Sequence, residues 1–208
     1  MDNADRPKGP LMTGAIGSFM IAAGLLIFFF TARQLLIMAM GGGMGGMGRE
    51  DSDTAGAMFL VTLALTGVGG ILAMVGFGGL GKIYGSTNMV GGLFALVLGI
   101  GCFVLVISGF AHSPGILKVS LYLILGGFAL SGIFGGIGQL ATTAVGKIAG
   151  IVLLIGGILW AWFFVGIFVP GVLEPLASII DIYLMALVLA PAAGFLLSGV
   201  SMLSARSA

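Results

Sequence analysis

Six long apolar stretches, parted by short polar segments, constrain this chain more than any other feature. Each stretch is 22 to 26 residues long. A helix of that length, rising about 1.5 Å per residue, crosses a hydrocarbon layer roughly 30 Å thick. The stretches are Leu11–Ala32, Ala55–Leu80, Met89–Ala111, Val119–Ala141, Ile148–Val169 and Ile182–Leu203. The sequence therefore predicts an all-α polytopic membrane protein with six transmembrane helices.

The composition supports one membrane-embedded domain over residues 1–208. Charged residues make up 7% of the chain, whereas about 25% is usual for a soluble domain. The segments between the apolar stretches are too short for a separate soluble domain, which needs roughly 50 residues in one piece. The net charge is +1 and no basic cluster occurs, so we expect a lipid bilayer and no nucleic acid as the partner.

The basic residues predict the orientation, because cytoplasmic loops carry an excess of Lys and Arg. With the N-terminus inside, five basic residues lie on the inner side and three on the outer side. The inner ones are Arg6, Lys8, Lys82, Lys147 and Arg206, and the outer ones are Arg33, Arg49 and Lys118. We expect both termini in the cytoplasm and a location in a prokaryotic cytoplasmic membrane.

Glycines recur in a pattern that is typical of an internal repeat. The first, third and fifth stretches each hold two glycines seven apart, which are Gly17 and Gly24, Gly92 and Gly99, and Gly150 and Gly157. A repeat would predict three tandem helical hairpins in the same orientation, as in some transporters and also in proteins that transport nothing. Chance recurrence among 39 glycines is the alternative.

Small residues four apart form stripes on several predicted helices. Such stripes let two helix backbones approach closely in lipid. The candidate helix-packing residues are Gly91, Ala95, Gly99, Gly132, Gly136, Ala186, Ala190, Gly194 and Ser198. The stripes predict tight helix pairs, and they leave open whether the partner helix belongs to this chain or to another.

The sequence offers no catalytic constellation. His112 is the only histidine and lies in a short turn beside Pro114, so a haem held by two histidines and an intramembrane Ser–His pair are both excluded. We therefore expect no enzyme activity and no cofactor.

Asp181 and Pro191 are candidates for an ion or proton site. Asp181 lies at the start of the sixth stretch and Pro191 lies inside it. A carboxylate embedded in the membrane is functional by default, whereas one at the surface serves as a helix cap. Both interpretations stay open at this point.

The segment after the first stretch is unusual in two ways. Arg33 and Gln34 interrupt the apolar run, so we expect Leu35–Met40 to lie along the membrane surface. Four methionines in a glycine-rich stretch are candidate Cu(I) ligands, because thioethers are soft ligands. They are Met38, Met40, Met44 and Met47. An adaptable contact loop is the alternative, since Met side chains conform to irregular surfaces.

Three hypotheses for function follow. The leading one is a non-catalytic integral membrane subunit that packs against other integral membrane proteins or forms a homo-oligomer. The first alternative is a small-solute or ion transporter with Asp181 and the Pro191 kink at its site. The second alternative is a Cu(I)-binding membrane protein that uses the methionine-rich loop.

Overall fold

The computed structural model describes residues 7–41, 49–111, 113–169, 171–172 and 180–207, without the side chains of 32–41, 49–53, 180–181 and 207. All the regular structure in these ranges is helical, in six helices that are long and apolar enough to cross a membrane. They are α1 (Lys8–Gly41), α2 (Arg49–Tyr84), α3 (Ser86–Ala111), α4 (Pro114–Leu140), α5 (Ala144–Phe168) and α6 (Ile180–Ser207). The predicted fold class is confirmed.

The described turns between helices are short, and local sequence explains where they fall. Gly85 alone joins α2 to α3, with a positive φ of 121° that glycine adopts without steric cost. Pro114 begins α4, where its missing N–H and fixed φ are favourable. The Thr143 hydroxyl accepts a hydrogen bond from the Gly146 N–H at 3.1 Å and so caps the start of α5. Consecutive helices are therefore held as close antiparallel neighbours.

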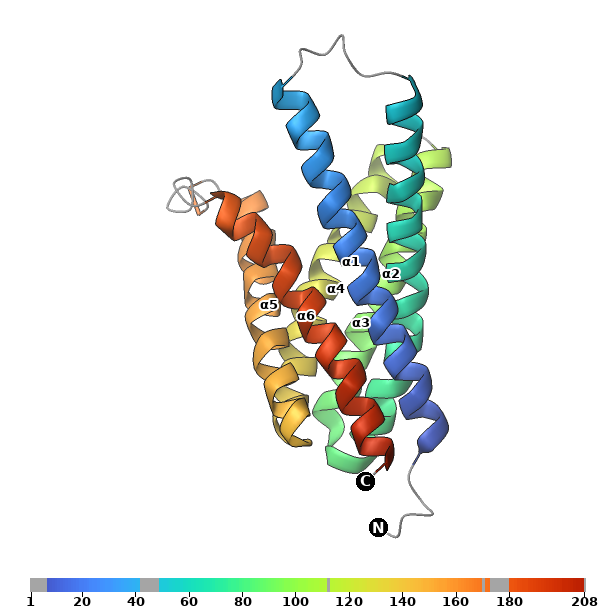
Figure 1. Ribbon diagram of the computed structural model, residues 1–208, viewed down its shortest axis with the longest axis vertical. Coiled ribbons are helices and arrows are strands. Elements are labelled where there is room, and N and C mark those ends of the chain that lie inside the picture. The colour runs from blue at the N-terminus through green and yellow to red at the C-terminus, as the bar shows by residue number, and fades with distance from the viewer. Residues whose placement is uncertain (1–6, 42–48, 112, 170, 173–179, 208) are drawn as a thin grey trace.

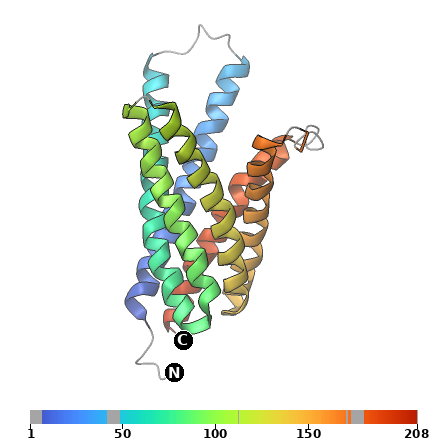
Figure 2. The ribbon, with the colours of Figure 1, turned by 180° about the vertical axis from the view of Figure 1, so that it is seen from behind.

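The six helices form a closed ring. Each helix packs against its neighbours in the sequence, and α6 closes the ring by packing against α1 (Figure 1). The view from behind shows α3 and α4 on the opposite face of the bundle (Figure 2). We call the end where α1 begins and α6 ends the terminal end. The end where α1 finishes and α2 begins is the distal end.

The first two helices are longer than the other four. They contain 34 and 36 residues, whereas the others contain 25 to 28. Both extend past the distal ends of the remaining helices (Figure 1). The expectation that Leu35–Met40 turns to lie along the membrane surface is wrong, because α1 continues through Arg33 and Gln34 to Gly41. The polar pair interrupts the hydropathy without interrupting the backbone hydrogen bonds, which depend little on side-chain polarity.

The recurring glycine pairs do not all occupy equivalent positions in the ring. A Cβ on Gly99 of α3 would meet the Gly67 oxygen of α2 at 2.6 Å, and one on Gly157 of α5 would meet the Ile133 nitrogen of α4 at 2.6 Å. Both helices thus turn their glycines toward the preceding even-numbered helix. A Cβ on Gly17 of α1 would instead meet the Gly69 oxygen of α2, also at 2.6 Å. A regular threefold ring would place Gly17 against α6.

Candidate functional site

The predicted small-residue stripes meet other helices of the same chain. A Cβ on Gly91 would lie 2.5 Å from the Gly135 nitrogen of α4. Real Cβ atoms essentially never come within 3.0 Å of a non-bonded heavy atom. The backbones of α3 and α4 therefore approach here as closely as only glycine allows.

The glycines of α4 make the equivalent approach to α5. A Cβ on Gly132 would lie 2.7 Å from the Gly157 Cα, and one on Gly136 would lie 2.7 Å from the Gly150 oxygen. On α6, a Cβ on Gly194 would lie 2.8 Å from the Leu153 side chain. Backbone atoms oppose the two α4 glycines, so a larger residue there requires the helices to separate.

The other stripe residues differ in how far they are covered. Ala95 and Ser198 are fully buried, and Ser198 accepts a hydrogen bond from the Gln139 amide. Ala186 and Ala190 are only half-buried. Most residues of the stripes therefore pack against other helices of this chain, so the stripes do not indicate a contact with a second protein.

Asp181 and Pro191 are not brought together. Asp181 is the second residue of α6, and its side chain lies outside the described part of the chain. Pro191 is ten residues further along, roughly 15 Å away along the helix axis. Pro191 packs against Gly156 of α5, where a Cβ would lie 2.9 Å from the Pro191 nitrogen. The proline ring therefore serves helix packing at this position.

The methionine-rich segment lies mostly outside the described residues. Met38 and Met40 belong to the last turns of α1, but their side chains are not among those described, and Met44 and Met47 lie between described segments. His112 is likewise outside the described residues. In the part of the chain that is described, no group of three His, Cys, Asp or Glu side chains is placed to hold a metal.

Sequence reasoning missed a buried polar cluster near the terminal end. Gln139 is 0% exposed and Asn88 1% exposed, although both carry amides. The Asn88 Nδ2 donates to the Gly138 oxygen at 3.0 Å, and the Gln139 Nε2 donates to the Ser198 hydroxyl. Their own side-chain oxygens, Oδ1 and Oε1, have no partner. Their rarity was a signal in the sequence, because Asn88 and Gln139 are the only Asn or Gln residues after Gln34.

Hydroxyl groups extend the cluster where α4, α5 and α6 meet. The Thr142 hydroxyl donates to the Gln139 carbonyl at 2.7 Å, and the Thr143 and Ser201 hydroxyls lie 3.4 Å apart. A neutral amide in hydrocarbon is costly unless it is hydrogen-bonded. These bonds therefore tie three helices together, and none of the groups that form them titrates near neutral pH.

The distal part of α2 has an unusual surface. Each residue from Gly56 to Val61 is exposed, so the described residues leave every side of the helix at least partly open there. The four large side chains in this stretch are 40 to 51% exposed, and they are Met58, Phe59, Leu60 and Val61. A Cβ on Gly56 would meet no atom within 4 Å. We call Gly56–Val61 the distal apolar segment.

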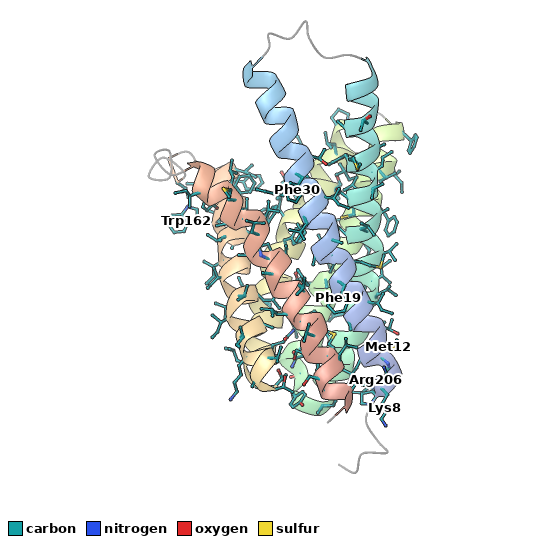
Figure 3. All side chains as sticks on the ribbon, in the orientation of Figure 1. Lys8, Met12, Phe19, Phe30, Trp162 and Arg206 are labelled. Carbon is teal, nitrogen blue, oxygen red and sulfur yellow. The ribbon has the colours of Figure 1, made fainter. Side chains whose placement is uncertain are left out.

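The terminal end presents basic side chains. The exposed ones are Lys8, Lys82, Lys147 and Arg206, on α1, α2, α5 and α6. The Arg206 Nη1 lies 3.2 Å from the Met12 Sδ, and Figure 3 shows Lys8, Met12 and Arg206 close together where α1 and α6 meet. The distal end has one described basic side chain, Lys118 of α4, which is also exposed.

Comparison with protein-family models, with curated proteins and with solved structures finds no match to this chain.

Proposed function

We propose that this protein is a non-catalytic integral membrane subunit that binds another integral membrane protein, or a second copy of itself, through the distal apolar segment of α2. The observation that supports the proposal is the exposure of this segment on every side. Its level at the edge of the hydrocarbon layer makes that exposure significant.

The distal apolar segment lies level with the last turn and a half of α3, and α2 continues beyond it. Gly99 of α3 lies against Gly67 of α2. From there α3 continues twelve residues to Ala111, whereas α2 continues eighteen residues to Arg49 in the same direction. The helix therefore rises at least six residues, roughly 9 Å, above the end of α3.

Lys118 indicates where the headgroups begin. A Cβ on Gly101 of α3 would lie 2.9 Å from the Ile124 nitrogen of α4, so Lys118, six residues beyond Ile124, lies about level with Ile107. The Gly99–Gly67 contact in turn places Ile107 about level with Phe59 of α2, since each lies eight residues from that contact. Since a lysine ammonium reaches the headgroups from the edge of the hydrocarbon, the distal apolar segment lies at the boundary between the hydrocarbon layer and the headgroups.

An apolar helix at this boundary contacts water wherever lipid tails do not cover it. Leaving four large apolar side chains half in contact with water costs roughly 4 kcal/mol, at about 1 kcal/mol each. Where lipid tails do not cover it, an exposed apolar surface marks an interaction site. A transmembrane partner whose helices also extend beyond the bilayer would cover it.

Site-specific photocrosslinking in native membranes tests the proposal. A benzophenone amino acid would replace Phe59 of the distal apolar segment or, as a matched control, Phe103 of α3. Both phenylalanines are 40% exposed, but Phe103 packs beside Gly67, deeper in the bilayer. We expect one discrete protein adduct from position 59, identified by its mass as another protein or as a dimer, and only lipid adducts from position 103.

A second variant separates a specific contact from accidental proximity. Leu60→Ser should reduce the yield of the adduct from position 59 by several fold, because it removes apolar area from the surface proposed to bind. Equal protein adducts from positions 59 and 103, or no protein adduct at all, would contradict the proposal.

A further inference from the structure

The meeting point of α1 and α6 at the terminal end carries two cations on one surface. Lys8 and Met12 are four residues apart and therefore share a face of α1. Arg206 of α6 reaches across to this face, with its Nη1 3.2 Å from the Met12 Sδ. Figure 3 shows Lys8 and Arg206 together with Met12 at this end of the bundle.

Among the described side chains, none is acidic and so none compensates these two cations. None of the seven acidic side chains is among those described. By sequence, residues at this end include five basic ones against Asp2 and Asp5, which lie outside the described residues. The guanidinium has five N–H donors, and a thioether is only a weak acceptor, so the contact with Met12 leaves donors of Arg206 for a stronger acceptor.

An apolar strip continues from the two cations toward the centre of the bundle. Met12 is 45% exposed, and Ile16, one turn further along the same face of α1, is 47% exposed. Phe19 closes the strip against α6, since a Cβ on Gly199 would lie 2.6 Å from its ring. The surface therefore combines cations at the headgroup level with exposed apolar side chains below them.

We infer that Lys8, Arg206 and the Met12–Ile16 strip form a binding site for an anionic phospholipid. The phosphate oxygens accept hydrogen bonds from the Arg206 guanidinium, whose planar fork fits them, and the Lys8 ammonium adds a second positive charge. One acyl chain lies along Met12 and Ile16. A zwitterionic lipid is disfavoured because its own cationic group meets the same two side chains.

Lipid retention measured by native mass spectrometry tests the inference. The full-length protein would be purified in mild detergent and equilibrated with equal amounts of dioleoylphosphatidylglycerol and dioleoylphosphatidylcholine. We expect the wild type to retain phosphatidylglycerol preferentially. Since one basic residue near an anionic surface contributes about fivefold in affinity, Arg206→Gln and Lys8→Gln should each reduce the preference about fivefold, and the double variant should abolish it.

Two lysine variants locate the site. Lys118→Gln removes an exposed cation at the distal end and should leave the preference unchanged. Lys147→Gln removes an exposed cation at the terminal end, on α5, away from the α1–α6 contact, and should also leave it unchanged. An equal loss with Lys147→Gln and Arg206→Gln would overturn the inference, because it would show a general attraction to the charged end.

Two further results would also overturn the inference. Full displacement of phosphatidylglycerol by millimolar inorganic phosphate would show that the site recognises free phosphate and makes no use of the acyl chain. Unchanged preference in a double variant that remains folded, as judged by protection of Cys102 from alkylation, would show that neither cation takes part. The site is at the opposite end of the molecule from the distal apolar segment, so this test is independent of the proposed function.

Discussion

The contact between α4 and α5 gives the sharpest prediction about stability. A Cβ at Gly132 would lie 2.7 Å from the Gly157 Cα and 2.9 Å from the Leu153 oxygen. Both are backbone atoms, so no side chain can rotate away, and α5 must move outward by several tenths of an ångström. Overpacking of this kind costs about 1–3 kcal/mol.

Two further terms adjust the expected magnitude for Gly132→Ala. One helical turn away, Phe128 of α4 stacks on Trp160 of α5 with ring centroids 4.9 Å apart, and outward movement of α5 weakens that pair, which is worth about 0.5–1.5 kcal/mol. Alanine in place of glycine favours the helix by up to about 1 kcal/mol. The net expectation is a loss of about 2 kcal/mol.

Gly126→Ala on the same helix is the matched control. A Cβ at Gly126 would meet no atom within 4 Å, so only the helix-propensity term remains and stability should be unchanged or slightly higher. Unfolding in sodium dodecyl sulfate, followed by tryptophan fluorescence, compares the two variants directly, because both tryptophans, Trp160 and Trp162, are on α5. Equal stabilities for the two variants would refute the reasoning about close backbone approach.

Three more predictions concern buried side chains. Ser198→Ala should lower the free energy of unfolding by about 1–2 kcal/mol, because it leaves the buried Gln139 amide without an acceptor. Gln139→Leu removes the whole amide and should lower the free energy of unfolding by less. A larger loss for Gln139→Leu than for Ser198→Ala in the same unfolding assay would contradict this. Tyr183→Phe should cost about 0.5–1.5 kcal/mol by removing the hydrogen bond from the hydroxyl to the Leu159 oxygen at 2.8 Å, and unchanged stability would count against that bond. Cys102, buried at 2% exposure, should resist maleimide until the protein unfolds, whereas rapid labelling of the native protein would contradict its burial.

Many contacts at the candidate site join residues whose partners no local sequence pattern identifies. The glycine stripes indicated close packing, but Gly91 turned out to meet α4 while Gly99 meets α2, because a stripe of residues four apart drifts around a helix with 3.6 residues per turn. Asp181 and Pro191 looked like a candidate pair by being near in sequence, and the helix separates them. Gln139 went unnoticed because a single amide in an apolar run has no motif, and its meaning comes from Ser198, 59 residues away.

The sequence by itself determined that this chain forms six membrane-crossing helices, because the length and apolarity of each stretch admit no other way to satisfy the backbone in lipid. Hydropathy also located the ends of five of the six helices to within six residues, yet it stopped α1 at Ala32, nine residues before the helix ends at Gly41. Only the tertiary structure decided which glycine meets which helix, that α6 closes the ring on α1, and that Lys8 and Arg206 share a surface. These are contacts between residues far apart in the sequence, and they depend on how all six helices pack at once, whereas helix formation depends only on neighbours along the chain.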